Sequence, residues 1–86
     1  LNKFLSDPTF GMVTDAFKAG DAQLALTATH TFKGLTANLG LTKLYNISSE
    51  MVSLIRDGDY GAAAGTFPDL KAAYDEICGI LKKGLL

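Results

Sequence analysis

The sequence contains no tryptophan, one cysteine, one histidine and no excess of charge of either sign. The single thiol, Cys78, has no second cysteine with which to form an internal disulfide. One cysteine and one histidine are also too few ligands for a zinc site, so we expect no metal site. Apolar residues flank Cys78, which predicts that it fills core space, and the lack of disulfides favours the cytoplasm.

Eight basic and nine acidic residues give a formal net charge of −1. This balance offers no basic surface for nucleic acid and no cationic face for a membrane. No apolar run approaches the ~20 residues needed to cross a bilayer, and no signal peptide is visible. Because the chain starts with Leu1 rather than methionine, we expect a trimmed chain or a domain of a longer protein.

The length of 86 residues allows one domain, over residues 1–86, and 48% hydrophobic residues suffice for a core. No segment alternates between apolar and polar residues with period two, so no strand is expected. The small size and near-neutral charge favour a monomer.

Glycine and proline divide the sequence into four blocks of helical length. The predicted helices run from Pro8 to Gly20, from Asp21 to about Leu39, from about Thr42 to Asp57, and within 60–84. Asp7 and Asp21 can cap the first two helices, and Gly20 and Gly40 can end them. Residues 1–5 are predicted to form a short helical turn that packs onto the bundle. The short connections predict an all-α, antiparallel, up-down-up-down four-helix bundle.

Apolar residues at helical spacing predict which faces of the last two helices are buried. In the third helix the inner stripe is Leu44, Ser48, Met51 and Ile55, with Leu41 and Val52 alongside. In the fourth it is Phe67, Leu70, Tyr74, Ile77 and Leu81. Pro68 predicts a kink or a restart within the fourth helix, because proline lacks the backbone N–H.

The second helix carries the only histidine, His30. At about 100° per residue, six residues of this helix fall within an arc of roughly 100°, which we predict to face the core. These residues are Leu24, Ala28, Thr31, Phe32, Leu35 and Leu39. His30 lies roughly 150° from the middle of that arc by the same arithmetic, and is therefore predicted to face solvent.

Lys33 and Gly34 follow His30 by three and four residues, so they share its face of the helix. A neutral imidazole is a good nucleophile near pH 7, and a lysine can neutralise the oxygens of a transferring phosphoryl group. A glycine inside a helix costs about 1 kcal/mol relative to alanine, so an exposed one indicates that something bulky must approach closely. No ATP-binding motif accompanies them, which predicts a phosphoryl carrier rather than a kinase.

The stretch "HTFKGLTANLG" resembles the signature of histidine-containing phosphotransfer domains, often H-x-x-K-G followed by small residues and L-G. Essentially the whole chain is similar to that family. "FLSDPTFGMVTDAFKAGDAQLALTATH" is similar to its first helix and the approach to the histidine. "LTKLYNISSEMVSLIRDGD" is similar to the following helix, with its closing R-x-G-D.

The resemblance implies that His30 accepts phosphate from an aspartate of a response-regulator receiver domain and passes it to another receiver. Lys33 would stabilise the phosphoryl oxygens, and Gly34 would leave room for the phosphoryl group and the receiver loop. The domain would hold no metal of its own, since the Mg²⁺ needed for transfer belongs to the receiver.

The resemblance also implies partners and a docking surface. Receiver domains and, where one exists, a hybrid histidine kinase would dock on Leu26, Thr27 and Ala37, which are otherwise ordinary surface residues. Asn38 either hydrogen-bonds near the site or helps to end the helix.

Two alternatives stay open at this point. One is the phospho-accepting amino-terminal domain of a chemotaxis-type histidine kinase. It ranks lower, because such domains usually carry acidic residues near the histidine and "LALTATHTFKG" has none. The other is a helical bundle that binds receivers without phosphotransfer. Such a module has no need of His30, Lys33 and Gly34 together.

Overall fold

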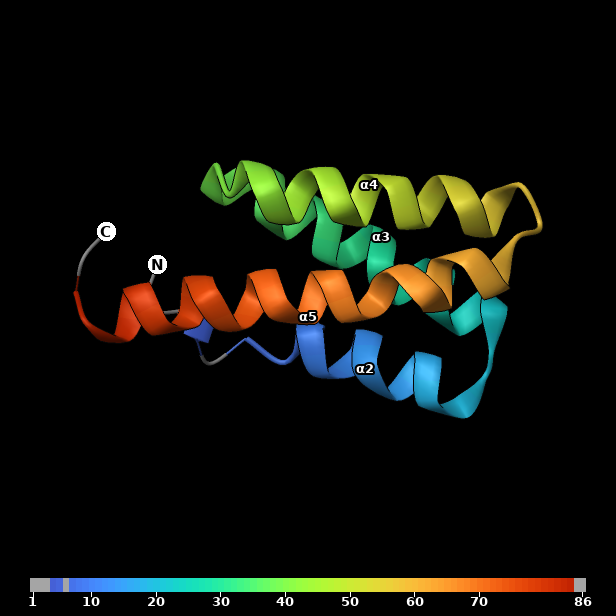
Figure 1. The fold of residues 1–86 in the computed structure, drawn as a ribbon, viewed down its shortest axis with the longest axis horizontal. Helices are drawn as coiled ribbons and strands as arrows, with labels where there is room; N and C mark the ends of the chain where they lie inside the picture. Colours follow the sequence, from blue (N-terminus) through green and yellow to red (C-terminus); the bar gives the residue numbers. More distant parts are fainter. Residues whose placement is uncertain (1–3, 6, 85–86) are drawn as a thin grey trace.

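The computed structural model describes residues 4–5 and 7–84 of the chain. Over these residues the chain forms four helices and no strand (Figure 1): α2 (Thr9–Ala19), α3 (Ala22–Leu39), α4 (Thr42–Arg56) and α5 (Tyr60–Lys82). Each helix packs against the next one in the sequence. The predicted all-α class is confirmed, and the bundle measures 39 × 21 × 19 Å.

Three of the four helices, α2, α3 and α5, begin where an aspartate side chain accepts a backbone N–H group, whereas α4 begins after Leu41 without a side-chain cap. Asp7 Oδ1 accepts the N–H of Thr9 at 2.8 Å, and Asp21 Oδ1 accepts the N–H of Leu24 at 3.1 Å. Asp59 Oδ1 accepts from Ala62 in the same way at 3.1 Å. These bonds satisfy donors that have no partner within the helix.

Two glycines end α2 and α3 as predicted. Gly20 has φ of 69° and Gly40 has φ of 71°, which is left-handed backbone that favours glycine. Both donate their N–H to carbonyls of the preceding helical turn. The connections are therefore short, and consecutive helices lie against each other.

The amino-terminal turn is predicted over residues 1–5. Residues 1–3 lie outside the described residues, while Phe4 and Leu5 are helical. Phe4 is buried, as expected, and its ring centroid lies 6.2 Å from that of Phe32.

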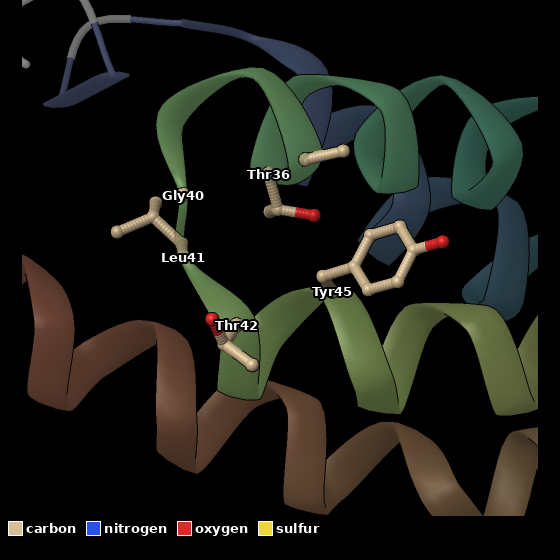
Figure 2. A pocket seen from close by; sticks show the side chains of 6 residues that line it. Thr36, Gly40, Leu41, Thr42 and Tyr45 are labelled. Atoms are coloured by element: carbon tan, nitrogen blue, oxygen red, sulfur yellow. The ribbon is translucent and has the colours of Figure 1, made fainter.

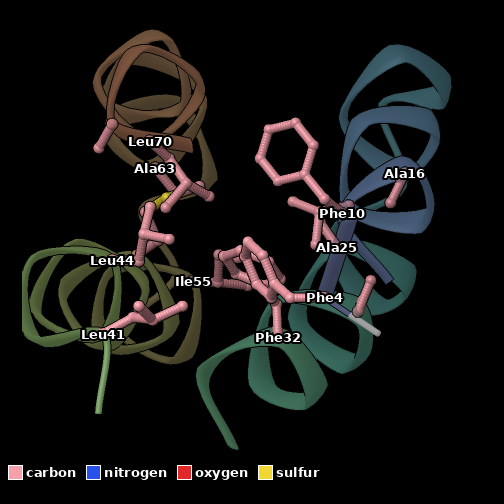
Figure 3. Packing of buried hydrophobic residues seen from close by; sticks show 14 residues of the cluster. Phe4, Phe10, Ala16, Ala25, Phe32, Leu41, Leu44, Ile55, Ala63 and Leu70 are labelled. Atoms are coloured by element: carbon pink, nitrogen blue, oxygen red, sulfur yellow. The ribbon is translucent and has the colours of Figure 1, made fainter. Parts of the chain in front are cut away.

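Aromatic rings from three helices meet in the core, and Figure 3 shows Phe10 and Phe32 among the buried residues. Phe10 of α2 stacks on Tyr74 of α5 with 3.9 Å between ring centroids. Phe32 of α3 lies 5.5 Å from Phe10 and 6.0 Å from Tyr74. Contacts between aromatic rings add to the free energy gained by burying them, so this cluster joins α2, α3 and α5.

The predicted inner stripe of α4 is confirmed. Its buried residues are Leu44, Ser48, Met51, Val52 and Ile55, and Leu41 just before the helix is buried too. In α5 the predicted stripe faces the core, but only Leu70 is fully buried and the other members are half-buried. α5 continues through Pro68, so a restart of the helix there is wrong.

The predicted core face of α3 needs correction. Leu24 and Thr31 are exposed, and the buried residues are Ala25, Ala28, Thr29, Phe32 and Thr36. The inward face is thus rotated by roughly 70° from the predicted arc. The reason is that α3 packs against both α2 and α4. Small alanine and threonine side chains occupy the face that both neighbours approach, whereas Leu35 and Leu39 lie half-buried at its side.

None of the four helices described is both long enough and apolar enough to cross a membrane.

Candidate functional site

His30 lies in the middle of α3 and is exposed, which confirms the predicted solvent-facing position. It lines an open surface hollow of about 290 Å³, here called the histidine hollow, together with Leu26, Thr27, Thr31 and Arg56. Four of these residues belong to α3, and Arg56 is the last residue of α4. The imidazole is therefore accessible at a junction between two helices.

Lys33 is half-buried and reaches from α3 toward α4. Its Nζ lies 5.8 Å from the centroid of the Tyr45 ring. A lysine ammonium at this distance from an aromatic ring is attracted by the negative face of the ring. The ring of Tyr45 thus helps to hold the Lys33 ammonium on the α4 side of α3.

Tyr45 also lines a second hollow, of about 250 Å³, here called the tyrosine hollow (Figure 2). The other lining residues are Thr36, Ala37, Gly40, Leu41 and Thr42, at the turn between α3 and α4. The ammonium of Lys33 lies over the same ring, so Lys33 contacts a residue of the tyrosine hollow while it belongs to the face of α3 that carries His30.

Gly34 is exposed, and a methyl group placed on its Cα would meet no other atom within 4 Å. Its backbone is helical, so no unusual φ requires glycine there. Packing within the protein therefore gives no reason for the glycine, and the space in front of it is open.

The four predicted docking residues fall in three places. Leu26, half-buried, and Thr27, exposed, line the histidine hollow. Ala37 is exposed and lines the tyrosine hollow instead. Asn38 is exposed and lines neither hollow. The structure thus brings Leu26 and Thr27 together with His30.

The hydroxyl groups of the histidine hollow already have acceptors. Thr27 Oγ1 donates to the carbonyl of Gln23 at 3.1 Å, and Thr31 Oγ1 donates to the carbonyl of Thr27 at 3.0 Å. Such bonds to the preceding helical turn use the only hydroxyl proton of each threonine. The groups left for chemistry in this hollow are the imidazole and the guanidinium.

Sequence reasoning missed Arg56 and Tyr45. The sequence places Arg56 only within a helix-ending pattern. Tyr45 directly follows Leu44 of the correctly predicted stripe, which places it at the edge of the buried face of α4. That adjacency was the available signal for Tyr45. For Arg56, the R-x-G-D pattern gave no indication of a position beside His30, because its neighbours in the hollow lie on another helix.

Shifted pKa values occur away from both hollows. Burial, and next a hydrogen bond with Cys78, raise the pKa of Tyr74 to about 12. Hydrogen bonds from the side chain and then the backbone of Thr9 lower the pKa of Asp7. These two groups bear on stability rather than on the chemistry of His30.

Within residues 4–5 and 7–84, no three histidine, cysteine, aspartate or glutamate side chains gather closely enough to hold a metal ion. No family model matches the chain, and no match was found among curated proteins or solved structures. The site itself is an exposed imidazole with a lysine one turn away, an open glycine beside it and an arginine from the next helix. Such a set can accept and hold an anionic group.

Proposed function

We propose that this protein is a histidine-containing phosphotransfer domain that carries a phosphoryl group between receiver domains. The observation that carries the proposal is the exposure of His30, the only histidine, beside the open space at Gly34. A phosphoryl group held on an aspartate of another protein can reach an imidazole only at such an unobstructed position.

The proposed reaction is a displacement at phosphorus. A lone pair of an imidazole nitrogen of His30 forms the new N–P bond, and the P–O bond of the aspartyl phosphate breaks. The aspartate leaves as a carboxylate, and the ring proton on the other nitrogen can pass to water. The reverse displacement, by a second receiver's aspartate, returns the phosphoryl group. Positioning and neutralisation of charge are the main requirements of such a step.

Lys33 supplies that neutralising charge in the proposal. Its ammonium lies 5.8 Å from the centroid of the Tyr45 ring, one helical turn from His30, and in the proposal the ring keeps it in position for the phosphoryl oxygens. The Mg²⁺ that the reaction requires is expected on the receiver. Leu26, Thr27, Ala37 and Asn38 remain the proposed docking residues.

The proposal extends to architecture and setting. We infer an antiparallel, up-down-up-down order of the helices, supported by the short turns at Gly20 and Gly40 and by the packing of consecutive helices. We also propose a monomer that works in the cytoplasm with receiver domains and, where one exists, a hybrid histidine kinase.

The test is phosphotransfer from phosphorylated receivers. The protein is expected to gain phosphate that is acid-labile and alkali-stable, and His30→Gln is expected to gain none. Failure to accept phosphate from any receiver of the source organism would refute the proposal. Binding to receivers without transfer would instead identify a receiver-binding bundle.

A further inference from the structure

Among the residues that the structure describes, Arg56 is the one charged residue that lines the histidine hollow with His30. It ends α4, whereas His30 lies in the middle of α3. A cation in the last turn of a helix interacts favourably with the helix dipole. That effect explains a positive charge at the end of α4 but not its position beside the imidazole.

No carboxylate neutralises Arg56 among the residues that the structure describes. The only ion pair within those residues joins Lys71 and Asp75, at 2.9 Å on the surface of α5. Of the aspartates that follow Arg56, Asp59 accepts the N–H of Ala62 with its carboxylate. No acidic residue within 4–5 and 7–84 lines the histidine hollow. The guanidinium thus keeps its donors available for an anion.

The neutral residues of the hollow cannot replace those donors. The hydroxyl protons of Thr27 and Thr31 are used by helix carbonyls, and Leu26 has no polar side-chain atom. Within the hollow, Arg56 is therefore the side chain that can donate hydrogen bonds to an anionic group on the imidazole. Guanidinium offers a planar pair of N–H donors that matches two phosphoryl oxygens.

We propose that Arg56 binds the phosphoryl group carried by His30, as a second cation that comes from α4 while Lys33 comes from α3. This inference rests on the proposed role of His30 as the phosphate acceptor. Arg56 acts after the N–P bond has formed, and stabilises the phosphorylated state.

The test loads His30 without any partner protein, using phosphoramidate as donor. An imidazole nitrogen forms the N–P bond, the P–N bond of phosphoramidate breaks, and ammonia leaves with the proton that balances the step. Because His30 is the only histidine, the product carries phosphohistidine at a single position. His30→Gln, treated identically, is the blank.

The first measurement is the Nε–H resonance of arginine in the intact protein. Arg56 is the only arginine, so one side-chain signal reports on it. Loading with phosphate is expected to shift this signal in the parent protein and to leave it in place in His30→Gln. An unmoved signal in fully phosphorylated protein would overturn the inference.

The second measurement is the titration of the phosphoryl group followed by its ³¹P resonance. A neighbouring cation favours the dianion, so Arg56→Gln is expected to raise the titration midpoint by about half a pH unit, the effect of one nearby charge screened by water. Arg56→Lys should raise it less. Lys82→Gln, which removes a last-turn cation from α5 instead, should leave it unchanged.

The outcomes separate this inference from the proposed function. Equal midpoints in the parent, Arg56→Gln and Lys82→Gln would refute the role of Arg56 and leave His30 as acceptor. A protein that phosphoramidate cannot load would refute both. A response of Arg56 in a protein that no receiver phosphorylates would support the anion site and refute the relay.

Discussion

Gly34 is a helical glycine with empty space in front of it, and two substitutions separate its effect on stability from its effect on access. Gly34→Ala is expected to raise the free energy of unfolding by about 0.5–1 kcal/mol, because alanine is the better helix former. Gly34→Gln should keep the helix content and slow phosphotransfer from a receiver.

These substitutions are checked by urea unfolding followed by circular dichroism, and by the rate of phosphate uptake. The matched control is Gly65→Gln, because Gly65 is also an exposed helical glycine with open space in front of it, but lies on α5. If Gly34→Gln accepts phosphate as fast as the control, clearance at Gly34 is unimportant.

The Tyr45 ring holds the ammonium of Lys33 at 5.8 Å. We expect Tyr45→Leu to slow phosphotransfer by about two- to five-fold, which corresponds to the ~0.5–1 kcal/mol of an exposed cation–π contact. Tyr45→Phe keeps the ring and should transfer at the parent rate. The measurement is the single-turnover rate, and a similar slowing of Tyr45→Leu in a Lys33→Ala background would show that the ring does not act through Lys33.

At the scale of the helix, Asp7 fixes the start of α2 through its bond to the N–H of Thr9. Asp7→Ala is expected to lower the free energy of unfolding by about 1 kcal/mol near neutral pH. Hydrogen bonds from Thr9 lower the pKa of Asp7 below its ordinary value of 3.8. The stabilisation is therefore present above about pH 4 and is lost as pH falls through the lowered value.

Chemical unfolding of the parent and Asp7→Ala at several pH values checks this expectation. Asp15→Ala, an exposed aspartate within α2, serves as the control and should show no loss. A difference between parent and Asp7→Ala that stayed constant down to about pH 2, below the ordinary range of aspartate, would mean that the cap does not act through the carboxylate.

The same helices show which features the sequence could predict. Their ends depend on Asp21, Gly20 and Gly40, whose effects are local, so they were predicted to within a residue or two. The buried face of α3 depends on two neighbouring helices, so the spacing of its apolar residues wrongly predicted that Leu24, which is exposed, faces the core. His30 stayed on the exposed side because it lies far from either version of the buried face.

In the candidate site, too, the residues close in sequence could be predicted and the residue from another helix could not. His30, Lys33 and Gly34 are close in sequence, and helical spacing alone placed them on one face. Arg56 enters the histidine hollow from α4, and that contact depends on how two helices pack. Spacing within one helix carries no information about it.

At the scale of the whole molecule, the titration of Tyr74 in the core makes the stability of the fold depend on pH. Burial, and then a hydrogen bond with Cys78, raise the pKa of Tyr74 to about 12 from the ordinary value of 10.0. Below about pH 10 the folded and unfolded chains both keep the phenolic proton. Between about pH 10 and 12 the unfolded chain loses it first, so the folded state loses stability as pH rises.

We therefore expect the parent protein to lose more stability than Tyr74→Phe between about pH 9 and pH 11.5. The free energy of unfolding in urea, measured for both proteins across this range, gives the comparison. Parallel pH profiles would show that Tyr74 titrates alike in the folded and unfolded chains.

The buried Phe32 and the exposed His30 stand two residues apart on one helix. The backbone that presents the imidazole is therefore anchored by the aromatic cluster and is ordered before any partner arrives. Association then requires no folding of a loop, so little of the binding free energy is spent on ordering the site. The rate of association with a partner is then set by orientation and charge. For the same reason, the backbone amide hydrogens around His30 should exchange with solvent only when the whole bundle opens.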